Sequence, residues 1–125
     1  MTILALDLGK KRIGLAISHG IMAEGIGIID FKNYFVELEK VIEKEKVDKI
    51  VIGLPLSASG EKTGQSAWSL DEGEKIAKKF GLPVSYVDEA YSSVVIESKK
   101  RYFDDESAKV ILEQYLNEEK SLSRR

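Results

Sequence analysis

The first part of the chain has the apolar pattern of short β-strands. Residues 3–8 are an apolar run that carries one aspartate, and residues 12–18 alternate larger apolar side chains with glycine and alanine. Residues 25–29 continue this pattern after a short link. Because turns that contain glycine join these segments, the pattern predicts an antiparallel meander of three strands.

After residue 31 the spacing of the apolar positions becomes helical. Residues 32–46 carry apolar side chains three and four positions apart, with Glu and Lys between them, which predicts an amphipathic helix. Residues 65–80 predict a second helix, although Gly73 lowers its helix propensity. Residues 104–119 predict the last helix, whose expected buried face consists of Ala108, Ile111, Leu112 and Tyr115.

Two short apolar runs between the helices predict buried parallel strands, at residues 48–53 and 84–87. Residues 54–64 are rich in Pro, Ser and Gly and predict a loop. Residues 92–101 are expected to be helical, and residues 121–125 to form a frayed tail.

This order of elements is typical of an α/β fold with one mixed sheet and helices on its faces. A right-handed crossover places the fourth strand beside the first. We therefore expect a five-stranded sheet of order 3-2-1-4-5 in which strand 2 is antiparallel. The pattern contains no domain boundary, so residues 1–120 are expected to form one domain.

Composition narrows the class of protein. Of the 125 residues, 43% are hydrophobic and 32% charged, which is typical of a globular domain. The absence of cysteine excludes disulfides, thiolate zinc sites and cysteine nucleophiles. The first residues lack the pattern of a signal peptide, and no apolar run approaches the roughly 20 residues that span a bilayer. We therefore expect a cytoplasmic protein.

Asp7 is the first candidate functional residue. It shares a strand face with Ile3 and Ala5, and a carboxylate on a central strand needs a compensating partner. A salt bridge to the basic turn at residues 10–12 would be a purely structural explanation. A bound metal ion is the functional alternative.

Asp88 and Glu89 follow the last predicted strand. Ligand sites in open α/β sheets lie beyond the carboxyl ends of the strands. Asp88 suits a capping role for a following helix, whereas the longer Glu89 can reach inward. Glu89 is therefore the second candidate acid.

Asp104 and Asp105 open the last helix, where acidic residues complement the helix dipole. Asp104 precedes Ala108 by four residues and Ile111 by seven, so it shares their buried face. Asp105 is rotated by about 100° from that face. Asp104 is therefore the third candidate acid, and we expect it to lie toward Asp7 and Glu89.

Three converging carboxylates would repel one another without a cation. Mg²⁺ and Mn²⁺ prefer hard oxygen ligands, and two such ions roughly 4 Å apart can assist hydrolysis of a phosphodiester. Asp7, Glu89 and Asp104 thus predict a site for Mg²⁺ or Mn²⁺. His19, the sole histidine, is expected to be a surface residue, and no P-loop or dinucleotide fingerprint occurs.

Four segments resemble the YqgF (RuvX) family, in register over nearly the whole chain. The first is Asp7-Leu8-Gly9-Lys10-Lys11-Arg12-Ile13-Gly14-Leu15-Ala16-Ile17-Ser18, and the second is Val51-Ile52-Gly53-Leu54-Pro55 followed by Gly60. The third is Gly81-Leu82-Pro83-Val84 leading to Asp88-Glu89, and the fourth spans residues 104–116.

The resemblance implies a three-layer RNase H-like fold, similar to that of Holliday-junction resolvases. It implies catalytic and metal-holding roles for Asp7, Glu89 and Asp104 in a two-metal-ion phosphodiester hydrolase. The family is implicated in maturing the 5′ end of the small-subunit (pre-16S) ribosomal RNA precursor. The chain departs from the family pattern at Ala90, where Arg is usual, and at His19, where Asp is usual.

The implied partner is structured nucleic acid, either pre-rRNA or branched DNA, with the ribosome or its precursor particles as further partners. The net charge of −2 does not mark a nucleic-acid binder, but basic clusters supply local positive charge. We expect a monomer or weak dimer. The residues predicted to bind nucleic acid are Lys10, Lys11, Arg12, Lys99, Lys100 and Arg101.

Three alternatives stay open on the sequence. The chain could be a Holliday junction resolvase that acts on four-way DNA. It could be a non-catalytic module that binds RNA or the ribosome, which Ala90 and the weak basic character favour. Actin-like ATPases and sugar kinases also begin with an apolar strand, an acid and glycines, but their two lobes need a longer chain.

Overall fold

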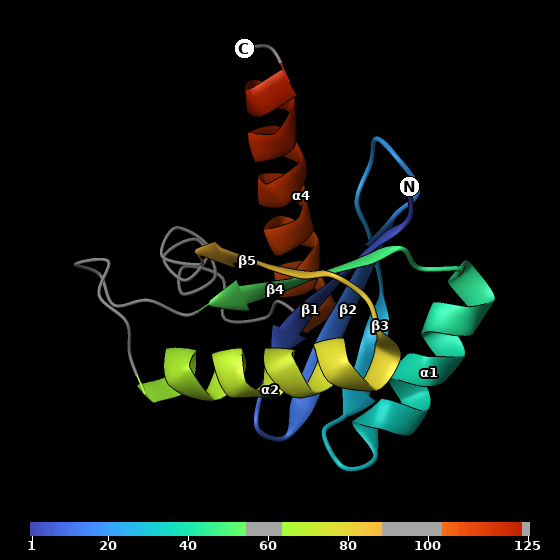
Figure 1. Ribbon diagram of the computed structural model, residues 1–125, viewed down its shortest axis with the longest axis vertical. Coiled ribbons are helices and arrows are strands. Elements are labelled where there is room, and N and C mark those ends of the chain that lie inside the picture. The colour runs from blue at the N-terminus through green and yellow to red at the C-terminus, as the bar shows by residue number, and fades with distance from the viewer. Residues whose placement is uncertain (55–63, 89–103, 124–125) are drawn as a thin grey trace.

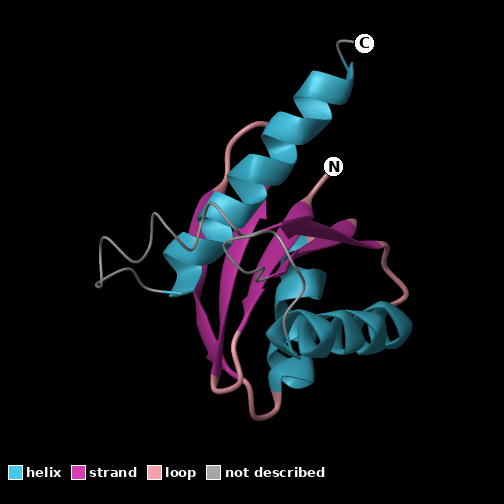
Figure 2. Ribbon diagram, turned by 90° about the vertical axis from the view of Figure 1, so that its left-hand side faces the viewer, coloured by secondary structure: helices cyan, strands magenta, loops and turns pink. Residues whose placement is uncertain are grey.

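A five-stranded mixed sheet with helices on both faces forms the protein (Figures 1 and 2). The computed structural model describes residues 1–54, 64–88 and 104–123. The order of the strands is β3-β2-β1-β4-β5, and β2 is antiparallel to both of its neighbours, as predicted. The elements are β1 (Ile3–Leu8), β2 (Arg12–Ser18), β3 (Glu24–Asp30), α1 (Tyr34–Glu45), β4 (Lys49–Leu54), α2 (Gly64–Phe80), β5 (Val84–Asp88) and α4 (Asp104–Ser123).

The central strand β1 divides the core into two layers, because alternate side chains of a strand point to opposite faces. Leu4, Leu6 and Leu8 pack with residues of α1 and α2. Ile3 and Ala5 pack on the other face, against α4. Figure 2 shows α4 on one side of the sheet and the other two helices on the opposite side.

The predicted buried face of the last helix, α4, is confirmed: Ala108, Ile111, Leu112 and Tyr115 are all buried. It extends to Ser123, beyond the predicted end at residue 119. Residues 117–123 contain neither glycine nor proline and include Glu and Lys, so local propensity favours continuing the helix.

Gly73 does not interrupt α2, which is continuous from Gly64 to Phe80. A Cβ atom at position 73 would collide with the ring of Tyr86 on β5. The glycine is therefore needed for close packing between α2 and the sheet.

The loop predicted at residues 54–64 lies mostly outside the described residues, since only its two end residues are described: Leu54 belongs to β4 and Gly64 to α2. The segment at residues 92–101, which the sequence predicts to be helical, lies wholly outside them.

Three strands end at one edge of the sheet, since β4 is parallel to β1 on one side and to β5 on the other. We call this the carboxyl edge, and the opposite edge, where β1 and β4 begin, the amino edge. No helix within the described ranges is both long and apolar enough to span a bilayer.

Candidate functional site

Asp7 lies near the end of β1 and is partly buried. It follows Ile3 and Ala5 on alternate positions of the strand, so it belongs to the face that α4 covers. Asp7 has a polar or electrostatic partner in the folded chain. The strand therefore holds this carboxylate at the carboxyl edge, on the face that it shares with Ile3 and Ala5 as the sequence predicts.

Glycines flank Asp7 on the sheet. Its partner on β2 is Gly14. On the other side, Leu6 pairs with Ile52 of β4, and continuing this parallel register by one residue brings Gly53 beside Asp7. Both glycines are buried and carry no side chain. The backbone thus keeps the surroundings of the carboxylate free of neighbouring side chains on two strands.

The turn after β1 is tight and basic. The backbone N–H of Gly9 donates to the carbonyl oxygen of Arg12 at 2.9 Å. A Cβ atom on Gly9 would lie 2.5 Å from that same oxygen, so only glycine fits there. Lys10, Lys11 and Arg12 are exposed, and together with Asp7 and Gly9 they line a shallow cavity of about 280 Å³. A carboxylate and three cations therefore share one depression.

The described residues 64–88 end at Asp88, one position before the second predicted acid, Glu89. Val87 of β5 is buried on the α4 face, the same face as Asp7, and Asp88 ends the strand beside Leu54. Glu89 is the next residue in the sequence and lies outside the described residues. The predicted cluster Lys99, Lys100 and Arg101 also lies outside them.

The third predicted acid, Asp104, is the first residue of α4, and its side chain is outside the described part of the structure. Tyr115 of the same helix is fixed at the amino edge, where Lys49 Nζ donates to its hydroxyl at 2.6 Å. The 11 residues before Tyr115 span about 16 Å of helix. They cover the sheet, while the end of α4 projects beyond it (Figures 1 and 2).

Asp7 meets the requirements of a ligand for Mg²⁺ or Mn²⁺: it offers carboxylate oxygens, a rigid strand holds it, and a cavity opens beside it. Among the residues that the structure describes, no three His, Cys, Asp or Glu side chains gather to hold a metal. Since Glu89 and the side chain of Asp104 are not among them, the convergence of the three acids stays a prediction.

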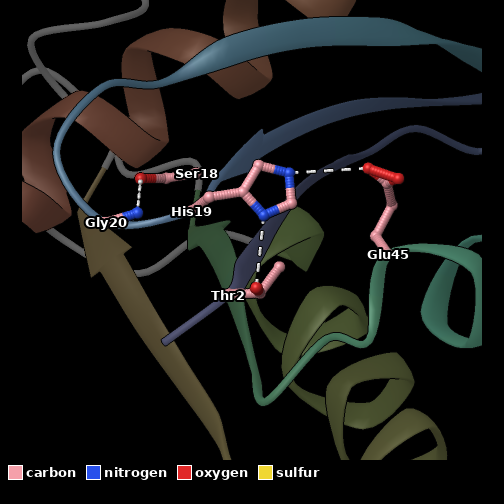
Figure 3. A network of polar contacts seen from close by, with 5 residues as sticks. All are labelled: Thr2, Ser18, His19, Gly20 and Glu45. Atoms are coloured by element: carbon pink, nitrogen blue, oxygen red, sulfur yellow. Dashed lines mark hydrogen bonds and ion pairs between the residues drawn. The ribbon is translucent and has the colours of Figure 1, made fainter.

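His19 lies at the amino edge, away from Asp7, because its neighbour Ser18 pairs with Ile3 at the start of β1. Its Nδ1 lies 3.3 Å from Thr2 Oγ1, and its Nε2 lies 3.5 Å from Glu45 Oε1 (Figure 3). The side chain is 61% exposed. The prediction of a surface histidine is confirmed. His19, which stands where the family usually has Asp, lies at the amino edge, whereas Asp7 lies at the carboxyl edge.

A second carboxylate, Glu72 of α2, is buried on the opposite face of the sheet and was missed in the sequence. Tyr34 of α1 donates a short hydrogen bond to Glu72 Oε2, and Lys75 Nζ lies 3.3 Å from Oε1. Burial, reinforced by the Glu72 carboxylate, raises the pKa of Tyr34 above its ordinary value. Glu72 stands midway between the inward Trp68 and Ile76, a spacing of four that marks an inward position.

Comparison with known proteins gives consistent results. The family model RuvX, described as Holliday junction resolvase, matches residues 1–118. A protein of Maridesulfovibrio salexigens named "Putative pre-16S rRNA nuclease" is 36% identical, with 93% of this chain and 98% of the relative covered. A relative of the same name from Burkholderia multivorans is 32% identical, with 94% of this chain and 89% of the relative covered.

Solved structures of RuvC from Thermus thermophilus show the same fold. RuvC in complex with a Holliday junction substrate matches with a TM-score of 0.61 at 12% identity, covering 89% of each chain. A second RuvC structure matches with a TM-score of 0.52 at 11% identity, covering 94% of this chain and 81% of RuvC. These likenesses confirm the RNase H-like fold. The extent of the family match and the identity to these relatives show that the chain belongs to the RuvX (YqgF) family.

Proposed function

We propose that this protein is a metal-dependent endonuclease that processes the 5′ end of pre-16S rRNA in the cytoplasm. The single observation that carries the proposal is Asp7, held on a rigid strand between two glycines and beside three exposed cations. The carboxylate of Asp7 can bind a metal ion there, and the cations beside it can bind the phosphates of a nucleic acid. The names of the relatives support the choice of RNA.

Asp7, Glu89 and Asp104 would hold Mg²⁺ or Mn²⁺ in this proposal. Bound divalent ions supply the positive charge that activates a water and stabilises the leaving oxygen during phosphodiester hydrolysis. The position of Val87 on the α4 face, two residues before Glu89, supports the choice of that acid. The spacing of Asp104 from the buried Ala108 and Ile111 supports the third ligand.

The basic residues have a separate task, which is to bind the substrate. Lys10, Lys11 and Arg12 contact backbone phosphates beside Asp7, in the cavity that these four residues line with Gly9. Lys99, Lys100 and Arg101 are proposed as further phosphate contacts. Binding through phosphates of this kind weakens steeply as the salt concentration rises.

A second candidate substrate is a four-way DNA junction. The fold of the chain matches RuvC in complex with a Holliday junction, and its family model is described as a resolvase. The same carboxylates and the same phosphate contacts would serve this substrate. The choice between RNA and DNA is therefore a question of substrate shape, which a direct comparison of the two can answer.

The test is to incubate the purified chain with labelled pre-16S rRNA and with a labelled four-way junction, each with Mg²⁺, Mn²⁺ or EDTA. We expect specific cleavage of the RNA with either metal and none in EDTA. Asp7→Asn should abolish cleavage, whereas Asp71→Asn, the same change at an exposed position of α2, should not. Salt-dependent RNA binding without cleavage at high protein concentration would instead select a non-catalytic module.

A further inference from the structure

A second cavity adjoins the one beside Asp7. It has a volume of about 410 Å³ and is lined by Lys10, Lys11, Asp30, Phe31 and Lys32. Lys10 and Lys11 line both cavities, so the two are neighbours that share one wall. A strand of nucleic acid that passes Asp7 can therefore continue past the same lysines into the second cavity.

A backbone hydrogen bond joins the two turns that form this surface. The N–H of Phe31, just after β3, donates to the carbonyl oxygen of Lys11 at 2.9 Å. Figure 1 shows the β1–β2 turn and the β3–α1 turn side by side at the foot of the sheet, and Figure 2 shows the same from another side. The lysines of both turns thus belong to one pre-formed surface.

Positive charge dominates this surface. Lys10, Lys11, Arg12 and Lys32 are all exposed. The one carboxylate in the second cavity is Asp30, which is also exposed and pairs across the strands with Arg12. The lining of the second cavity thus has three cations, Lys10, Lys11 and Lys32, against one carboxylate, which favours binding of an anion there.

The floor of the second cavity is rigid and partly apolar. The ring of Phe31 lies 4.9 Å from that of Tyr34 and 5.5 Å from that of Trp68, measured between centroids. Tyr34 is buried, so the aromatic group is anchored in the core between α1 and α2. Such a floor can contact a sugar or base while the lysines above it contact the phosphate.

We propose that the second cavity binds the nucleotide next to the one held at Asp7, and that Lys32 contacts its phosphate. This proposal rests on the function proposed above, since it extends the path of the same substrate. It adds Lys32 to the basic residues predicted from the sequence. Lys32 was missed there because it stands alone in the sequence and joins Lys10 and Lys11 only in the fold.

The experiment measures binding of a labelled pre-16S rRNA fragment by fluorescence anisotropy, in EDTA to prevent cleavage and over a series of salt concentrations. Lys32→Gln should weaken binding severalfold at low salt. It should also make the plot of the logarithm of the binding constant against the logarithm of the salt concentration less steep by about 0.7–0.9, which is the contribution of one phosphate contact. Lys44→Gln is the matched control, because Lys44 is exposed and precedes Glu45 at the amino edge. It should leave binding unchanged.

Asp30→Asn provides a change of opposite sign. It removes the carboxylate from the second cavity, so it should strengthen binding. Lys11→Gln serves as the reference for the proposed function, since Lys11 lines both cavities. If Lys11→Gln weakens binding while Lys32→Gln behaves like Lys44→Gln, the second cavity is not part of the path and the proposed function stands. If the wild-type chain binds neither the RNA nor a four-way junction, both proposals are wrong.

Discussion

Two carboxylates on opposite faces of one sheet, Glu72 and Asp7, have different surroundings. Glu72 of α2 is buried where this helix meets α1, and Tyr34 and Lys75 contact its two oxygens. Asp7 is partly buried on the α4 face, with glycine on either side and a cavity beside it. The first acid is enclosed in the core, whereas the second has a partner in the chain and also lines a cavity at the surface.

The glycines on the two faces of the sheet also have different neighbours. Gly73 on α2 makes room for the ring of Tyr86, so the space is already filled by the protein. Gly14 and Gly53 are buried on either side of Asp7, the proposed metal ligand, and leave it without a neighbouring side chain on β2 and β4. Both faces are packed, but in the described part of the chain only the α4 face ends in a carboxylate with a cavity beside it.

Asp7→Asn should give the largest effect and should affect activity alone. We expect cleavage of pre-16S rRNA to fall at least about 100-fold, which is roughly 2.7 kcal/mol of transition-state stabilisation. The thermal unfolding temperature should stay close to that of wild type, because the amide has the same shape as the carboxylate. Kinetic assays and thermal unfolding of the same preparation check both statements, and full activity would remove Asp7 from the mechanism.

Tyr34→Phe should give the opposite result. It deprives the buried Glu72 of its hydroxyl donor, and an unsatisfied buried acceptor costs about 1–3 kcal/mol. Urea unfolding should reveal this loss, whereas the rate of cleavage at a temperature where the variant is folded should match wild type. A loss of activity without a loss of stability would contradict the division between the two faces.

Gly73→Ala should destabilise the protein by about 1–2 kcal/mol, because the new methyl group overpacks the contact with Tyr86. Gly64→Ala is the matched control in the same helix, since a Cβ atom there has open space. The control should be neutral or slightly stabilising, as alanine favours the helix. Chemical unfolding of the two variants compares them directly, and equal behaviour would mean that α2 is not packed tightly on β5.

The smallest effect concerns alkaline pH. The pKa of Tyr34 is raised in the folded state, so above the ordinary tyrosine pKa of about 10 the unfolded chain releases a proton that the folded chain retains. This contribution to stability is complete below pH 10 and declines as the pH rises further. Unfolding free energies of wild type should therefore fall with pH more steeply than those of Tyr34→Phe, by up to about 1.4 kcal/mol per pH unit.

Much of the fold can be predicted from the sequence because its pattern is local and consistent. Alternation places Asp7 with Ile3 and Ala5, and spacings of three and four place Ala108, Ile111 and Tyr115 on one face of α4. Each of these positions agrees with the structure. Short-range periodicity therefore suffices for the elements and their buried faces.

The site is harder to predict, because it depends on contacts between distant segments. Lys32 joins Lys11 only when β3 returns beside β2, and Glu72 is enclosed only when α1 packs against α2. A polar residue on an inward helix position has the same sequence pattern whether it binds a neighbour or a ligand. Likewise, whether Glu89 lies beside Asp104 depends on the path of the chain between them, which local periodicity does not determine.

The most direct test of the metal site is a crystal structure of the protein with Mn²⁺, in which anomalous scattering locates the ions. We predict Mn²⁺ at the carboxyl edge, bound by Asp7, Glu89 and Asp104 with metal–oxygen distances of about 2.1 Å. Ions bound elsewhere would contradict this account. So would an Asp7 carboxylate more than roughly 12 Å from both other acids, because paired ions span only about 4 Å.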